Sequence, residues 1–135
     1  MNRIIITVAK TPKGYSASCE LLQGWIVAVT GSFEDLKLQV KDSIDFYVSC
    51  AKEDGDSYPT VFDDEYELDY KFNIESLLCC YEKIFTRSAL EHITGINQKQ
   101  LSHYACGRSK PRKVTAEKIV NALHKLGKEL CYVSI

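Results

Sequence analysis

Apolar residues follow two different spacings along this chain, and the first is the spacing of short strands. In the opening thirty residues, apolar and β-branched side chains gather in three short runs, which turn residues separate at positions 11–14 and 23–24. Runs of this kind between turns are typical of half-buried strands that neighbour one another in an antiparallel sheet. Three strands are therefore expected, at Arg3–Ala9, Gly14–Glu20 and Trp25–Thr30.

The spacing becomes helical after Gly31. Ser32 with Asp35 three residues later predicts a capping box, in which each residue hydrogen-bonds the backbone of the other. Apolar residues then recur at steps of three and four as far as about Lys52, which predicts one helix laid across a face of the sheet. Its apolar face consists of Phe33, Leu36, Val40, Ile44, Tyr47, Val48 and Ala51.

A second alternating segment precedes the end of this first half. After a loop at residues 53–65, aromatic and apolar residues alternate with charged ones from Tyr66 to Phe72, which predicts a strand that could join the sheet. The period is helical from Asn73 to Gly127, so we place a domain boundary after residue 72. Four helical segments are expected, around residues 74–84, at Ser88–Ile93, at Asn97–Ala105 and at Thr115–Leu126. The last is expected to begin at Thr115 as N-cap and to end at Gly127 as its C-terminal cap.

The connection between the second and third of these segments is very short. Gly95 can adopt the positive φ that lets the chain leave one helix and enter the next after about three residues. Asn97 is the expected N-cap of the next helix, with Gln100 at the capping-box position, and Ile96 and Leu101 are expected to face inward. The outward face then consists of Gln98, Lys99, Ser102 and His103.

Charge divides the chain at the same boundary. The whole chain has a net charge of −1, but residues 1–72 hold 7 Lys/Arg and 13 Asp/Glu, whereas residues 73–135 hold 10 and 5. An acidic half joined to a basic half suggests different partners for the two. No apolar run approaches the roughly 18 residues of a membrane span, and the six scattered cysteines favour reduced thiols, so a cytoplasmic protein is expected.

Residues 95–112, G-I-N-Q-K-Q-L-S-H-Y-A-C-G-R-S-K-P-R, resemble the lambda-repressor-like helix-turn-helix family. The resemblance continues in a helix that ends with Ala122-Leu123-His124-Lys125-Leu126-Gly127, and Glu91 stands where the family usually has a small residue. It implies a recognition helix in the major groove of double-stranded DNA, with phosphate contacts from the loop that follows. The implied DNA-binding residues are Gln98, Lys99, Ser102, His103, Arg108, Lys110, Arg112 and Lys113.

Two alternatives stay open for this segment. Helix-turn-helix geometry sometimes serves protein contacts only, and a basic run can be merely a solvated surface. His103 is as well explained by an ordinary surface histidine as by a contact to DNA. A metal site at His103 and Cys106 is not expected, because two ligands without a second pair do not make a zinc motif.

The acidic half resembles the HicB antitoxin family in its strand-strand-strand-helix order, in Gly14-Tyr15-Ser16-Ala17, and in the helix start at Gly31–Leu36. That resemblance implies a truncated ribonuclease-H-like fold and a small basic toxin partner of the HicA type. The fold class expected for the whole chain is therefore α+β, with a small antiparallel sheet and one helix in residues 1–72. An all-α helix-turn-helix domain and a terminal strand would make up residues 73–135.

An enzyme is not expected. Ribonuclease-H chemistry needs carboxylates that converge on two Mg²⁺ ions, yet the densest cluster, Asp63-Asp64-Glu65, lies in a loop and no carboxylate stands on the strand at residues 3–9. We expect no catalytic residue, metal or cofactor. A metal-dependent nuclease is the least favoured of the alternatives.

The last seven residues, Glu129–Ile135, are apolar and β-prone. A lone strand needs a partner for its backbone groups, so this segment is expected either to return to its own sheet or to pair with a second subunit. We favour the second, because helix-turn-helix proteins usually read two half-sites as homodimers. The leading hypothesis is an antitoxin-like transcriptional regulator, and the alternative is a stand-alone regulator whose first domain senses a ligand or another protein.

Overall fold

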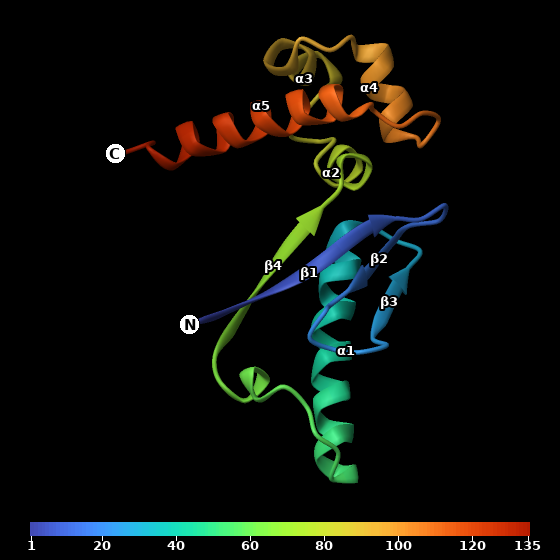
Figure 1. Ribbon diagram of the computed structural model, residues 1–135, viewed down its shortest axis with the longest axis vertical. Coiled ribbons are helices and arrows are strands. Elements are labelled where there is room, and N and C mark those ends of the chain that lie inside the picture. The colour runs from blue at the N-terminus through green and yellow to red at the C-terminus, as the bar shows by residue number, and fades with distance from the viewer. The chain divides into compact units, whose positions relative to one another are not determined.

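The computed structural model describes residues 1–135 and combines a four-stranded sheet with helices (Figure 1). The chain divides into two compact units, Met1–Asn73 and Ile74–Ile135, which we call unit 1 and unit 2. The division falls one residue after the expected position. No helix combines the length and the apolar character needed to cross a membrane.

The sheet of unit 1 contains β1 (Asn2–Lys10), β2 (Tyr15–Ser18), β3 (Ile26–Val29) and β4 (Tyr66–Phe72), in the order β3-β2-β1-β4. The first three strands are antiparallel neighbours, as the sequence predicts. β4 pairs with β1 in parallel, so the expectation of a wholly antiparallel sheet was wrong. The reason is the helix between β3 and β4: it returns the chain along the sheet before β4 begins, and such a crossover makes the strands on either side of it parallel.

That crossover helix is α1 (Phe33–Asp54), and it covers one face of the sheet (Figure 1). Alternate residues of β1, namely Ile4, Ile6 and Val8, are buried. They share the core with the apolar face of α1, whose buried members are Leu36, Val40, Ile44, Val48 and Ala51. The spacing of apolar residues thus predicted correctly which face of the helix is buried.

Both ends of α1 are capped. The Ser32 hydroxyl accepts a hydrogen bond from the backbone N–H of Asp35 at 3.2 Å, and the Asp35 carboxylate accepts one from the N–H of Ser32 at 2.9 Å. The predicted capping box is therefore confirmed. Gly55 ends the helix with a φ of 69°, which a residue with a side chain adopts only with strain. A 3₁₀ helix at Thr60–Asp63 lies in the expected loop.

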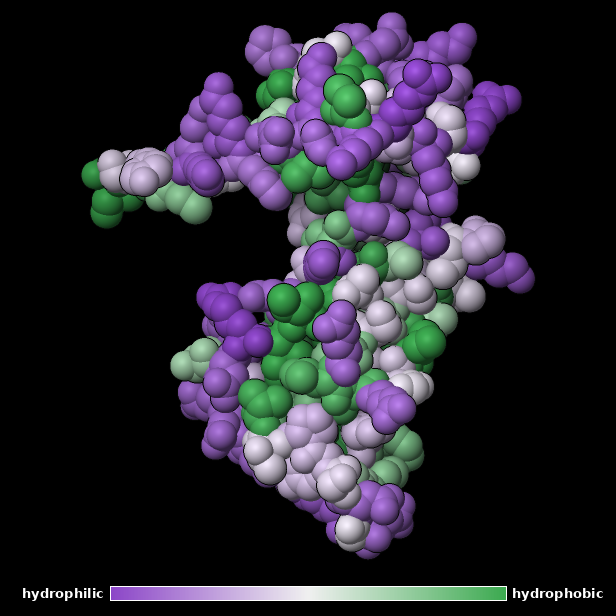
Figure 2. Space-filling view, in the orientation of Figure 1, coloured by the Kyte–Doolittle hydropathy of each residue, from purple (hydrophilic) through white to green (hydrophobic).

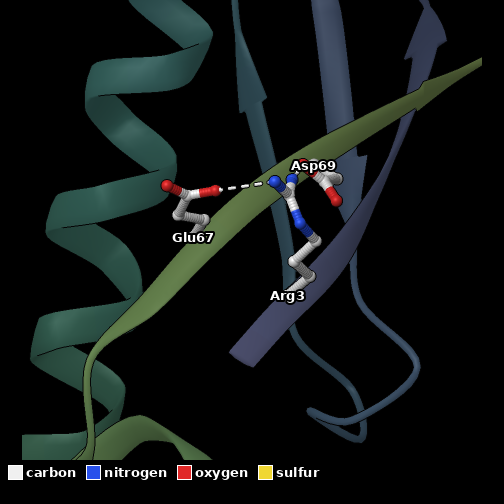
Figure 3. A network of polar contacts seen from close by, with 3 residues as sticks. All are labelled: Arg3, Glu67 and Asp69. Carbon is white, nitrogen blue, oxygen red and sulfur yellow. Dashed lines mark hydrogen bonds and ion pairs between the residues drawn. The ribbon is translucent and has the colours of Figure 1, made fainter. Parts of the chain in front are cut away.

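The exposed face of the sheet has an ion-paired network between its two parallel strands (Figure 3). Arg3 on β1 contacts Glu67 and Asp69 on β4, at 3.2 and 2.8 Å. The hydrogen bond to Asp69 and the charges of both carboxylates raise the pKa of the Arg3 guanidinium. This network holds two of the carboxylates of the acidic half next to a cation.

Unit 2 contains four helices: α2 (Ile74–Cys80), α3 (Arg87–Thr94), α4 (Gln98–Ala105) and α5 (Lys113–Cys131). Their apolar faces meet in one core, built around the fully buried Leu90, Leu101 and Ile119. The Cys79 thiol on α2 lies 3.2 Å from the carbonyl oxygen of Ala105, at the end of α4. α3 and α4 lie within one residue of their predicted segments, whereas α2 ends at Cys80, four residues before the predicted end at residue 84, and both ends of α5 differ from the prediction.

α5 begins two residues before Thr115, the predicted N-cap, and its actual N-cap Arg112 makes no capping hydrogen bond. At the other end, the helix continues through Gly127 to Cys131, so Gly127 is not a C-terminal cap and has no positive φ. The expected strand at Glu129–Ile135 was wrong for the same reason. Good helix-forming residues surround Gly127 on both sides and outweigh the cost of about 1 kcal/mol that one glycine imposes, while the helix satisfies the backbone groups that a lone strand would leave unpaired.

Candidate nucleic-acid interface

Three residues, Gly95–Asn97, connect α3 to α4. Gly95 has a φ of 74°, and its N–H donates to the carbonyl of Glu91 at 2.8 Å, which ends α3. Asn97 then begins α4, with its side-chain oxygen accepting from the N–H of Lys99 at 2.8 Å. The positive φ at Gly95 and the N-cap at Asn97 are both as predicted from the sequence, and together they turn the chain sharply between two short helices.

A buried hydroxyl fixes this turn from inside. Thr94 is 3% exposed; its hydroxyl donates to the carbonyl of Leu90 at 2.6 Å and accepts from the N–H of Ile96 at 3.1 Å. The same side chain therefore satisfies a carbonyl of α3 and the amide that follows the glycine. The sequence argument missed Thr94, although a threonine directly before a helix-ending glycine is a recognisable signal.

Opposite faces of α4 have opposite environments. Leu101, Tyr104 and Ala105 are buried in the core of unit 2. Gln98, Lys99 and Ser102 are exposed, as expected from their spacing. His103 is half-buried, so the expectation of a fully outward histidine was only partly right. The predicted capping contact of Gln100 is replaced by another one: its amide donates to the Ser109 hydroxyl at 3.5 Å.

Glu91 on α3 contacts the first residue of α4. Its carboxylate accepts from the backbone N–H of Gln98 at 3.3 Å and from the side-chain amide of Gln98 at 3.2 Å. A carboxylate at a helix N-terminus is favourable, because free N–H groups and the helix dipole gather positive charge there. The same contact gives the Gln98 amide a partner within the chain and places a negative charge beside the outward face of α4.

The loop after α4 folds back on the last turn of that helix. The N–H groups of Arg108 and Ser109 both donate to the carbonyl of His103, at 3.0 and 3.4 Å. Gly107 makes the turn with a φ of 75°, and a Cβ at this position would lie 3.0 Å from a carboxylate oxygen of Glu75 on α2. The positive φ therefore favours glycine here, and a side chain would in addition have to displace the end of Glu75 by a few tenths of an ångström.

Four cations follow in this loop and at the start of α5. Arg108, Lys110, Arg112 and Lys113 are exposed, and none of them takes part in an ion pair. A fifth cation was not expected at this site: the ammonium group of Lys118 on α5 lies 3.4 Å from where a Cβ of Gly95 would stand. The turn between α3 and α4 and the loop after α4 are thus both lined by unpaired positive charge.

No family model, curated protein or solved structure matches this chain.

The acidic cluster of unit 1 is divided between two roles. Asp63 contacts the Lys52 ammonium at 3.2 Å and accepts a hydrogen bond from the Tyr58 hydroxyl at 2.9 Å. The hydrogen bond to Asp63 is the main cause of the raised pKa of Lys52. Asp64 and Glu65 are exposed in the loop. No three His, Cys, Asp or Glu side chains are grouped in a way that could hold a metal ion.

A shallow hollow lies beside the second half of α1. It is lined by Trp25, Ser43, Phe46, Tyr47, Cys50, Ala51, Asp54, Asp56 and Ser57. The Trp25 indole N–H donates to the Ser43 hydroxyl at 2.9 Å, which fixes one wall, and Phe46 is 71% exposed at the other. The hollow therefore combines aromatic surface with two carboxylates at one end.

Proposed function

We propose that this protein is a cytoplasmic DNA-binding transcriptional regulator of the antitoxin kind. In this proposal, α3 and α4 form a helix-turn-helix of the lambda-repressor-like type, and α4 enters the major groove of operator DNA. Unit 1, with a truncated ribonuclease-H-like fold like that of HicB antitoxins, binds a small basic toxin of the HicA type. The protein acts as a homodimer and is not an enzyme.

The observation that carries the DNA-binding proposal is the exposed polar face of α4 together with the unpaired cations around it. Exposed Lys99 in the first turn of α4, where recognition helices touch base edges, and exposed Ser102 about one turn later offer donors and acceptors on one face. Cations without an intramolecular partner are free to replace the counterions of DNA phosphates. A purely solvated surface gives no reason for two conformationally required glycines, Gly95 and Gly107, on either side of this helix.

The test is a salt titration of binding to the DNA directly upstream of the coding sequence, followed by fluorescence anisotropy. Four phosphate contacts per copy, or eight for the homodimer, correspond to a slope of about −7 in log affinity against log salt, or roughly a 10⁴-fold loss between 50 and 200 mM. A random-sequence duplex of the same length is the control for specificity. Absent binding, or binding that salt does not weaken, would contradict the proposal.

The toxin-binding part rests on charge. Unit 1 holds six more acidic than basic residues, and the outward face of α1 displays Asp42 and Asp45 together with the exposed Phe46. Acidic and apolar groups side by side suit a basic partner with apolar contacts of its own, because complementary charge speeds and orients association. The test is co-purification of the full chain with the small basic protein encoded in the neighbouring reading frame, where Asp42→Lys with Asp45→Lys should abolish capture and Lys13→Ala should not.

The second candidate is a stand-alone regulator whose unit 1 senses a ligand. The hollow lined by Trp25, Phe46 and Tyr47 favours it, since aromatic walls with a few polar groups are typical of small-molecule sites. A neighbouring frame without a small basic protein, together with intact operator binding, would favour this candidate. The nuclease alternative predicts Mg²⁺-dependent cleavage that Asp64→Ala removes, and we expect no cleavage.

A further inference from the structure

The apolar stripe of α5 does not end where the core of unit 2 ends. Ile119, Leu123, Leu126, Leu130 and Val133 follow one another at steps of four, three, four and three. Ile119 is fully buried and Leu126 is half-buried, whereas Leu130 is 57% and Val133 is 76% exposed. Such spacing places the first four on one side of α5, with Val133 just after its end, and is the spacing by which one helix packs along another.

The exposed part of the stripe spans the end of α5: Leu130 lies in the last helical turn, and Val133 lies two residues after the helix ends at Cys131. The N–H groups of Tyr132 and Val133 donate to the carbonyls of Glu129 and Leu130, at 3.1 and 3.2 Å, which keeps Val133 against the last turn of α5. In Figure 1, α5 extends past the other helices of its unit, and Figure 2 shows hydrophobic residues gathered at its C-terminal tip. The first half of the stripe therefore packs within the chain and the second half is bare.

Gly127 lies between the two halves. A Cβ at this position would meet nothing within 4 Å, so nothing inside the chain calls for glycine there. Glycine in the middle of a helix is unfavourable relative to alanine, and it allows a second backbone to approach closely. The surface at Gly127 is therefore open to a second chain.

One flank of the stripe is complementary to itself. Lys125 and Glu129 stand on this flank, each two residues from Gly127, and neither makes an ion pair within the chain. If a second copy of α5 crosses antiparallel at Gly127, each Lys125 faces the Glu129 of the other copy. This flank also borders a shallow groove between α3 and α5, which is lined by His92, Ile93, Ala122, Lys125, Leu126 and Glu129.

We propose that a second copy of this chain docks on the groove side of the C-terminal half of α5, with the two helices antiparallel and crossing at the axial level of residue 127. Leu130 and Val133 of each copy then cover the groove beside Ile93 and Leu126 of the other, and two Lys125–Glu129 pairs border the contact. In a dimer with twofold symmetry, both copies contribute the same surface to the contact, so a single self-complementary surface is sufficient to form the dimer. This inference rests on the proposed function, which takes the protein to be a homodimer. It assigns the dimer contact to α5, because the C-terminal strand that was expected to form it is absent.

The test measures the molar mass of the full chain in solution by sedimentation equilibrium, without DNA. The wild type should have twice the 15.3 kDa of one chain at micromolar concentration. Leu130→Lys should raise the dissociation constant of the dimer at least about 30-fold, because a buried apolar anchor is replaced by a charge. Val114→Lys, at a residue 78% exposed near the other end of α5, should leave it unchanged.

Charge exchange tests the antiparallel arrangement. Lys125→Glu and Glu129→Lys should each raise the dissociation constant about fivefold, as for an exposed ion pair, and the double variant should restore it. Circular dichroism of each variant checks that its helix content is unchanged, and Leu130→Ala gives a milder change at the same position. A wild type that stays monomeric at 200 µM, a dimer that survives Leu130→Lys, or a charge exchange without restoration would each overturn the proposal. Because no DNA is present, a protein that fails to bind DNA can still pass this test.

Discussion

The carboxylate of Glu91 on α3 holds Gln98 at the first turn of α4 by two hydrogen bonds, one to the backbone N–H and one to the side-chain amide. Gln98 is the residue of α4 that the family resemblance would place first against a base. In this chain its amide already has a partner, and that partner brings a negative charge to the face proposed to meet phosphates. In the proposed DNA complex, Glu91 would therefore compete with DNA for the N-terminus of α4.

Glu91→Ala should tighten DNA binding about three- to tenfold at low salt, because it removes a negative charge near the phosphates and frees the Gln98 amide. The same change should lower the free energy of unfolding by about 0.5–1 kcal/mol, since α4 loses an acceptor at its N-terminus. Anisotropy titrations and thermal unfolding measure the two effects. Gln98→Ala should change affinity little in the wild type and more in the Glu91→Ala background; weaker binding by Glu91→Ala would contradict this account.

Lys99 and the loop cations should differ in what they contribute. Replacing Lys110 or Arg112 by alanine should reduce the salt slope by about 1 each and weaken binding to all sequences alike. Lys99→Ala should cost about 1–3 kcal/mol of binding free energy on the operator and less on random DNA if it contacts a guanine edge. Lys83→Ala, at an exposed cation between α2 and α3, is the control. Equal effects of Lys99→Ala on both DNAs would assign Lys99 to the phosphates instead.

Thr94→Val tests the hydroxyl inside the turn. Valine keeps the shape but leaves the buried N–H of Ile96 without its acceptor, so the free energy of unfolding should fall by about 1–3 kcal/mol. Thr94→Ser keeps both hydrogen bonds and should lose less. Chemical denaturation followed by circular dichroism compares the two. Equal stability of the valine variant and the wild type would show that the hydroxyl does not hold the turn.

Unit 1 should lose stability at alkaline pH. Burial, together with the charge of Glu34, raises the pKa of Tyr70 on β4, and burial does the same for Tyr66. A phenol whose pKa is higher in the folded state stabilises the fold fully below its ordinary pKa of about 10, and this contribution is lost as pH rises through the folded value. Tyr70→Phe should therefore flatten the decline of unfolding free energy above pH 10. Identical decline in both proteins would exclude Tyr70 as its cause.

Local signals in the sequence predicted much of this structure. The capping box at Ser32 and Asp35, the positive φ at Gly95 and the N-cap at Asn97 each depend on residues within four positions of one another. The hydrogen bonds and backbone conformations involved are all formed within a short stretch of chain, so the sequence of that stretch is sufficient to predict them. The exposed side chains of α4 follow from the same local periodicity.

The predictions that were wrong depend on interactions between residues far apart in the sequence. Gly127 looks like a helix end, but whether a helix stops depends on what the following residues would do instead, and here they had no strand to pair with. The parallel pairing of β4 depends on the course of a 22-residue helix. The bond between Glu91 and Gln98 spans seven residues and a turn, so the sequence marked Glu91 only as an unusual residue for its position.

Because α5 is one uninterrupted helix, its length fixes the distance between the proposed dimer contact and α4 within each copy. Its 19 residues span about 28 Å, from Lys113, directly after the loop that follows α4, to Cys131, next to the exposed Leu130. Two such rods crossing near their ends would set the distance between the two DNA-reading helices by helix geometry, with no flexible linker to adjust it. One alanine inserted after Asn121 would turn the dimer surface by about 100° relative to α4, whereas seven inserted residues would nearly restore its direction and lengthen the rod. The spacing between the two operator half-sites would then be determined by the length of α5.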